Sequence, residues 1–159
     1  MAFLEEYANL SHDPGTLVRI GTDAKSEPVM AFIRCVPYHE HERIEREHKV
    51  GGQDFATLPK LTRESVLIAK AKLAFADAGP GFTVKVGDPA KLEQLRPLLP
   101  GLQIVEGEEI KLQGHMTEEL KDWLFRSSSK GMFLVQKVLE AESNLRKESL
   151  RSEETQAKN

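Results

Sequence analysis

Residues 117–145 read TEELKDWLFRSSSKGMFLVQKVLEAESNL, and this stretch contains two helical patterns separated by three serines. Thr117 is a favourable N-cap residue, and the two glutamates after it suit the positive end of a helix dipole. After the serines, a second helix is predicted from Gly131 to about Arg151. Its apolar residues follow the four-three-four spacing of a packing seam: Leu134, Val138, Ala141 and Leu145.

Before residue 117, short strand patterns alternate with helical ones. Strands are predicted over 16–20, 30–36, 82–86, 102–105 and 110–112, with the first two joined as a hairpin. Helices are predicted over 1–9, 38–48, 63–78 and 90–99. The sequence therefore predicts an α+β fold, in which a small sheet of short strands packs with helices and is followed by a helical C-terminal arm. The predicted parts are a small α+β domain over 1–116, a C-terminal helical pair over 117–151 and a disordered polar tail over 152–159.

The composition is that of an ordinary globular protein. The chain has 159 residues, of which 40% are hydrophobic and 30% charged, and its net charge is −3. This balance predicts no broad basic surface for nucleic acid. Cys35 is the only cysteine, so no intramolecular disulfide can form. No apolar run is long enough for a bilayer, and the first residues lack the pattern of a signal peptide, so we expect a cytoplasmic protein.

Two groups of residues raise the question of catalysis. His41, Glu45 and His48 fall on one side of the predicted helix 38–48, at a spacing that could bind zinc in a small metal-dependent enzyme. The alternative is a solvated helix face rich in acid–base pairs, and the charged surroundings favour it. Cys35 lies in an apolar strand and is interpreted as a small buried core residue rather than a nucleophile. We therefore expect a protein without catalytic activity, metal or cofactor.

The large apolar side chains of residues 123–139 occupy more than one helix face. Phe125 adjoins Leu124 and Phe133 adjoins Leu134, so one face can serve the core while the other is available to a partner. The alternative is that both faces are buried in the protein's own core. A helix with such a seam favours self-association or binding of a partner helix. The predicted partner-binding residues are Trp123, Phe125, Phe133, Leu134, Val138 and Leu139, and a homo-oligomer is expected.

The order of these parts resembles a known family. Phe32-Ile33-Arg34 precedes a proline and a charged helix, AKAKLAFAD at 69–77 leads to Phe82-Thr83-Val84, and LQGHMTEELK at 112–121 opens the final helices. Over about residues 16–151 this resembles the tail assembly chaperones of long-tailed bacteriophages and prophages. The chain departs from that family at 77–81, where Asp-Ala-Gly-Pro-Gly replaces the Asp-Trp or Asp-Ser-Glu-Asn common there.

The resemblance implies a specific role. Such proteins bind the long, aggregation-prone tape measure protein in the host cytoplasm and keep it soluble while tail tube subunits polymerise around it. The implied partners are therefore the long helical tape measure protein and the tail tube protein, with neither nucleic acid nor membrane. An alternative from another class is a structural tail component, such as a tail-completion or connector subunit that is retained in the virion.

Overall fold

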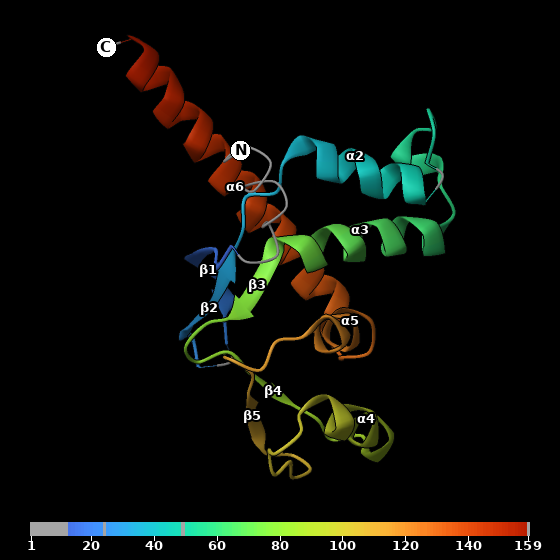
Figure 1. Ribbon diagram of the computed structural model, residues 1–159. Coiled ribbons are helices and arrows are strands. Elements are labelled where there is room, and N and C mark those ends of the chain that lie inside the picture. The colour runs from blue at the N-terminus through green and yellow to red at the C-terminus, as the bar shows by residue number, and fades with distance from the viewer. Residues whose placement is uncertain (1–12, 24, 49, 159) are drawn as a thin grey trace.

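The computed structural model describes residues 13–23, 25–48 and 50–158, with 151–158 described by their backbone only, and confirms the predicted α+β fold (Figure 1). The helix predicted over 1–9 lies outside the described residues. The strands are β1 (Thr16–Thr22), β2 (Pro28–Ile33), β3 (Phe75–Ala78), β4 (Thr83–Lys85) and β5 (Glu109–Lys111). The helices are α2 (Tyr38–Glu47), α3 (Lys60–Ala74), α4 (Pro89–Leu95), α5 (Glu118–Arg126) and α6 (Gly131–Lys158), with short 3-10 turns at Phe55–Thr57 and Arg96–Leu98.

The larger sheet is antiparallel and has the strand order β1-β2-β3. β1 and β2 form the predicted hairpin, with Thr16 opposite Ile33 at its open end. The Asp23 carboxylate holds the turn, because one oxygen accepts the backbone N–H groups of Lys25 and Glu27 at 2.8 and 2.9 Å. An aspartate that closes a turn in this way competes with regular secondary structure and ends the strand.

The third strand, β3, replaces the end of a predicted helix. The sequence predicts a helix over 63–78, but α3 ends at Ala74 and the next four residues pair with β2. The Arg34 N–H donates to the Ala74 oxygen at 2.7 Å, and the Gly79 N–H donates to the Met30 oxygen at 2.9 Å. A Cβ on Gly79 would lie 2.6 Å from that same Met30 oxygen. Pairing with β2 therefore overrides the local helical preference of residues 75–78.

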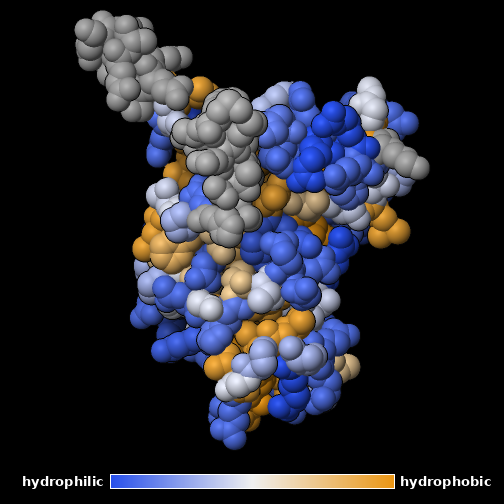
Figure 2. All heavy atoms as spheres, viewed as in Figure 1, coloured by the Kyte–Doolittle hydropathy of each residue, from blue (hydrophilic) through white to orange (hydrophobic). Residues whose placement is uncertain are grey.

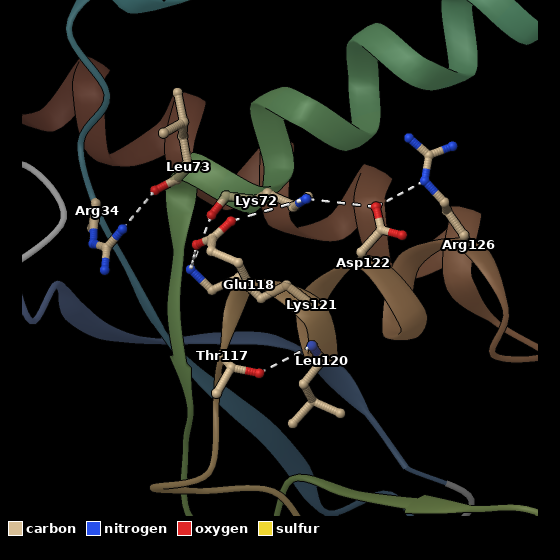
Figure 3. A network of polar contacts seen from close by, with 9 residues as sticks. All are labelled: Arg34, Lys72, Leu73, Thr117, Glu118, Leu120, Lys121, Asp122 and Arg126. Atoms are coloured by element: carbon tan, nitrogen blue, oxygen red, sulfur yellow. Dashed lines mark hydrogen bonds and ion pairs between the residues drawn. The ribbon is translucent and has the colours of Figure 1, made fainter. Parts of the chain in front are cut away.

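Two buried cations close the C-terminal end of α3. The last carbonyl groups of a helix have no intrahelical partners, and α3 enters β3 without a glycine cap that could satisfy them. Arg34 Nη1 donates to the Leu73 oxygen at 3.2 Å, and Lys121 Nζ donates to the Lys72 oxygen at 3.1 Å. Figure 3 shows both cations at this end of the helix. Positive groups are favoured there by the helix dipole, so residues distant in sequence complete the helix.

The smaller sheet is the antiparallel pair β4–β5, which lies below α5 in Figure 1 together with α4. Asp88 caps α4, accepting the Ala90 N–H at 2.9 Å. The helix predicted over 90–99 ends early, because Pro97 cannot donate a helical hydrogen bond. The strand predicted over 102–105 does not form, whereas the one predicted over 110–112 appears as β5.

One main hydrophobic core joins the sheet, α3, α5 and α6. Phe75 of β3 packs edge-on against both Phe82 and Phe125, with ring centroids 5.8 Å apart in each pair. The predicted helical pair thus shares its core with the α+β part. A second, smaller cluster of Ile44, Val50, Leu58 and Val66 holds α2 against α3.

The last helix is longer than predicted. The sequence predicts a helix to about Arg151 and a disordered tail over 152–159, but α6 continues to Lys158. Residues 151–158 contain neither proline nor glycine and are mostly good helix formers, so the helix has no local reason to stop. In Figure 1 this end of α6 projects beyond the rest of the molecule.

Candidate functional site

The structure divides the six predicted partner-binding residues into two groups. Trp123, Phe125 and Val138 are buried in the main core, whereas Phe133 keeps 58% of its surface exposed. Leu134 and Leu139 are half-buried against the core. The interpretation of Phe125 as a free surface residue is wrong, because α5 is covered by both α3 and α6 and its second apolar face meets Phe75. The accessible residues of the set are Phe133, Leu134 and Leu139.

Two of the predicted residues beside the core, Phe133 and Leu134, line a groove together with Trp123. The groove has a volume of about 460 Å³ and lies between the β1–β2 hairpin, β4 and the α5–α6 connection. We call it the α5–α6 groove. Its apolar lining residues are Ile20, Val29, Phe82, Val84, Val86, Trp123, Leu124, Phe133 and Leu134. Hydrophobic residues also reach the surface around β4 and β5 in the view of Figure 2.

Trp123 adds a polar atom to this apolar lining. Its indole nitrogen, Nε1, is buried and has no hydrogen-bond partner among the residues that the structure describes. An indole N–H can only donate, and leaving a buried donor unpaired costs on the order of 1 to 3 kcal/mol. Trp123 therefore combines a large apolar surface with an unsatisfied donor beside the groove.

Lysines surround the groove in excess over acids. The lining includes Lys85, Lys91, Lys130 and Lys137 against Asp23, Asp88 and Glu109. The Lys137 ammonium lies 5.5 Å from the centre of the Phe133 ring and 3.7 Å from a Glu140 oxygen. The lining therefore contains one more lysine than acidic residue, whereas the chain as a whole carries a net charge of −3.

A second polar feature is the buried carboxylate of Glu142 on α6, and its role is structural. Glu142 is 1% exposed and accepts the Val36 N–H at 3.1 Å and an Arg146 nitrogen at 2.8 Å. His41 Nε2 lies 3.5 Å from the same carboxylate. This carboxylate therefore ties α6 to the segment between β2 and α2. Its position four residues after Val138 places it beside the apolar stripe, but the local sequence does not indicate the Val36 N–H that it accepts.

The three residues considered as zinc ligands, in α2 and at its C-terminal end, contact three different partners. His41 faces Glu142, Glu45 pairs with Lys70 at 3.0 Å, and His48 Nδ1 lies 2.8 Å from the Ile44 oxygen. Among the described residues, no three His, Cys, Asp or Glu side chains are placed to share a metal ion. The helix face is also less solvated than its charges indicate, since His41 and Ile44 are buried where α2 packs on the protein.

Cys35 is exposed, which corrects its interpretation as a core residue. β2 ends at Ile33 and the buried Arg34 follows, so the strand alternation does not extend to Cys35. Desolvation is the main cause that raises the pKa of the thiol, and the nearby Glu142 carboxylate adds to it. A raised pKa lowers the thiolate fraction and opposes nucleophilic chemistry.

Within the described part of the chain, no helix has both the length and the apolar character needed to cross a bilayer. Comparison of the chain with protein-family models, with curated protein sequences and with solved structures found no match.

Proposed function

We propose that this protein is a tail assembly chaperone of a long-tailed phage or prophage, which binds the tape measure protein in the host cytoplasm and keeps it soluble. The observation that carries the proposal is the α5–α6 groove, an apolar depression with Phe133 exposed beside it. The motif order over residues 16–151 supports the same class of function.

A groove of this kind suits a helical partner. An amphipathic helix places apolar side chains every three or four residues along one face, and such a face docks into a hydrophobic groove. Covering the exposed part of the Phe133 ring would contribute on the order of 1 kcal/mol, and the half-buried Leu134 would add to this. A long helical protein offers many such faces, so several chaperone molecules can cover one partner.

Coexpression tests the proposal. The chain is produced together with its proposed partner, the tape measure protein of the same phage or prophage, and the soluble fraction of that partner is measured after centrifugation. We expect the wild-type chain to raise the soluble fraction and the Phe133→Glu variant to lose this effect. Tyr38→Glu is the matched control, because Tyr38 is an exposed aromatic residue on α2, away from the groove.

Two outcomes would contradict the proposal. One is a partner whose solubility is unaffected by the wild-type chain. The other is recovery of the chain in purified phage particles at a fixed ratio to the tail subunits, which would support the alternative of a structural tail component.

A further inference from the structure

We infer that the α5–α6 groove selects an amphipathic helix whose apolar face is flanked by aspartate or glutamate side chains. The inference rests on the proposed function, since it names the chemistry of the segment that the same groove binds. It is carried by the charges around the groove, taken with the apolar lining already described.

The carboxylates of the groove are largely engaged within the protein. Asp23 accepts two backbone N–H groups of the hairpin turn, and Asp88 accepts the Ala90 N–H at the start of α4. Glu109 lies opposite Lys85 in the β4–β5 pair. Local hydrogen bonds therefore hold two of the three acids of the groove in place.

Three of the four lysines are unpaired. Lys85, Lys91 and Lys130 form no ion pair within 4.0 Å with any residue that the structure describes, whereas Lys137 lies 3.7 Å from Glu140. An apolar groove with unpaired ammonium groups at its edge is complementary to an apolar helix face with carboxylates beside it.

The lysines are expected to act mainly on selection and on the association rate. Exposed charges at the edge of an interface steer the encounter and penalise like charges, while the apolar contact supplies most of the affinity. These charges are screened by salt, with a Debye length of about 8 Å at physiological ionic strength. Binding of the preferred helix should therefore weaken as salt is added.

Trp123 provides the readout. It is the only tryptophan of the chain and it lines the groove, so a change in its fluorescence reports occupation of the groove. The probes are two synthetic helical peptides without tryptophan that share one stripe of leucine and phenylalanine. Glutamate flanks the stripe in the first peptide and lysine flanks it in the second. We expect the glutamate peptide to bind about tenfold more tightly, with an affinity that falls with salt.

Variants of the full chain test whether the preference for the glutamate peptide arises from the groove. The double variant Lys91→Glu with Lys130→Glu is expected to abolish or reverse the difference between the peptides. Lys147→Glu is the matched control, because Lys147 is exposed on α6 outside the groove and its reversal alters the net charge without altering the groove. Phe133→Ala is expected to weaken the binding of both peptides.

Equal binding of the two peptides, or an unchanged preference in the double variant, overturns the inference. A change in Trp123 fluorescence with protein concentration alone also overturns it, since a second copy of the chain would then occupy the groove. The coexpression assay separates this inference from the proposed function. If the two peptides bind equally while the wild-type chain keeps the partner soluble, the charge selection fails and the chaperone function stands. If the peptides bind as expected and the partner stays insoluble, the proposed function fails.

Discussion

The side-chain nitrogen of Lys121 lies 3.1 Å from the main-chain oxygen of Lys72, where α3 ends and β3 begins. Lys121 belongs to α5 and is 4% exposed, so a cation from one helix closes the end of another inside the protein. Its ammonium also lies 3.2 Å from Glu118, and the Lys72 ammonium is 3.5 Å from Asp122, which completes the network of Figure 3. The contact between the two helices depends on this junction.

Replacing Lys121 by methionine should lower the free energy of unfolding by about 1 to 3 kcal/mol, because the part-buried Lys72 oxygen loses its charged donor. Methionine keeps most of the apolar stem, so the loss reports the donor. Urea unfolding followed by circular dichroism measures it. Lys147→Met, at an exposed position of α6, should change stability by less than about 0.5 kcal/mol. Equal effects of the two substitutions would show that the Lys121 contact contributes nothing specific.

The same lysine should make stability depend on pH above neutrality. Desolvation by burial lowers the pKa of Lys121 from its ordinary value of 10.5, and Glu118 opposes this. Between the two pKa values the unfolded chain binds more protons than the folded one, so the contribution of Lys121 to stability rises with pH. We expect the difference in unfolding free energy between wild type and Lys121→Met to increase as the pH rises toward 10.5, the ordinary pKa of lysine. A difference that stays constant or decreases would contradict this.

Glu142→Ala should destabilise the protein by about 2 to 3 kcal/mol, because the buried Val36 N–H loses its acceptor and α6 loses its tie to the segment after β2. Glu140→Ala is the control on the same helix. Its carboxylate is exposed and its ion pair with Lys137, at 3.7 Å, lies at the surface. The loss of stability should therefore stay below about 1 kcal/mol. Thermal and urea unfolding of both variants measure the contrast, and similar stabilities would refute the structural role of Glu142.

Alanine substitutions at Phe125 and Phe133 should differ in their effects on stability and on partner binding, although the two residues were predicted to share one surface. Phe125→Ala removes a ring from the core and should cost about 3 to 5 kcal/mol of stability. Phe133→Ala removes an exposed ring and should cost less than about 1 kcal/mol while weakening partner binding. Unfolding free energies and the coexpression assay test the two expectations together. A large loss of stability in Phe133→Ala would place that ring in the core instead.

Cys35 should react with a thiol reagent in the folded protein, but more slowly than free cysteine at the same pH. Its exposure allows access, while the raised pKa reduces the thiolate fraction. The rate of labelling by iodoacetamide, measured by mass spectrometry against pH, checks both parts. Labelling only after unfolding would show that the thiol is inaccessible, and a rate above that of free cysteine would show that its pKa is lowered.

Several elements could be predicted from the sequence because local interactions determine them. Thr117 accepts the Leu120 N–H at 3.2 Å, and Asp88 accepts the Ala90 N–H, so each caps the helix that its sequence indicated. The β1–β2 hairpin likewise follows from alternation around a polar turn. Of the candidate site, Phe133 was predicted to lie beside the stripe that begins at Leu134, and the structure leaves Phe133 58% exposed while Leu134 packs against the core. In each case the relevant hydrogen bonds or periodicity lie within a few residues of the chain.

The sequence by itself therefore determined the α+β class, the caps, the hairpin and the apolar richness of residues 123–139. Only the tertiary structure decided that residues 75–78 become a strand, that Phe125 faces the core, and that Arg34 and Glu142 are buried. The physical reason is the same in each case. A helix end, an aromatic face or a charge can be buried only when a partner supplies the missing hydrogen bonds or apolar contact. Those partners lie 39 residues away for Arg34 and Leu73, and 106 residues away for Val36 and Glu142, where no local pattern records them.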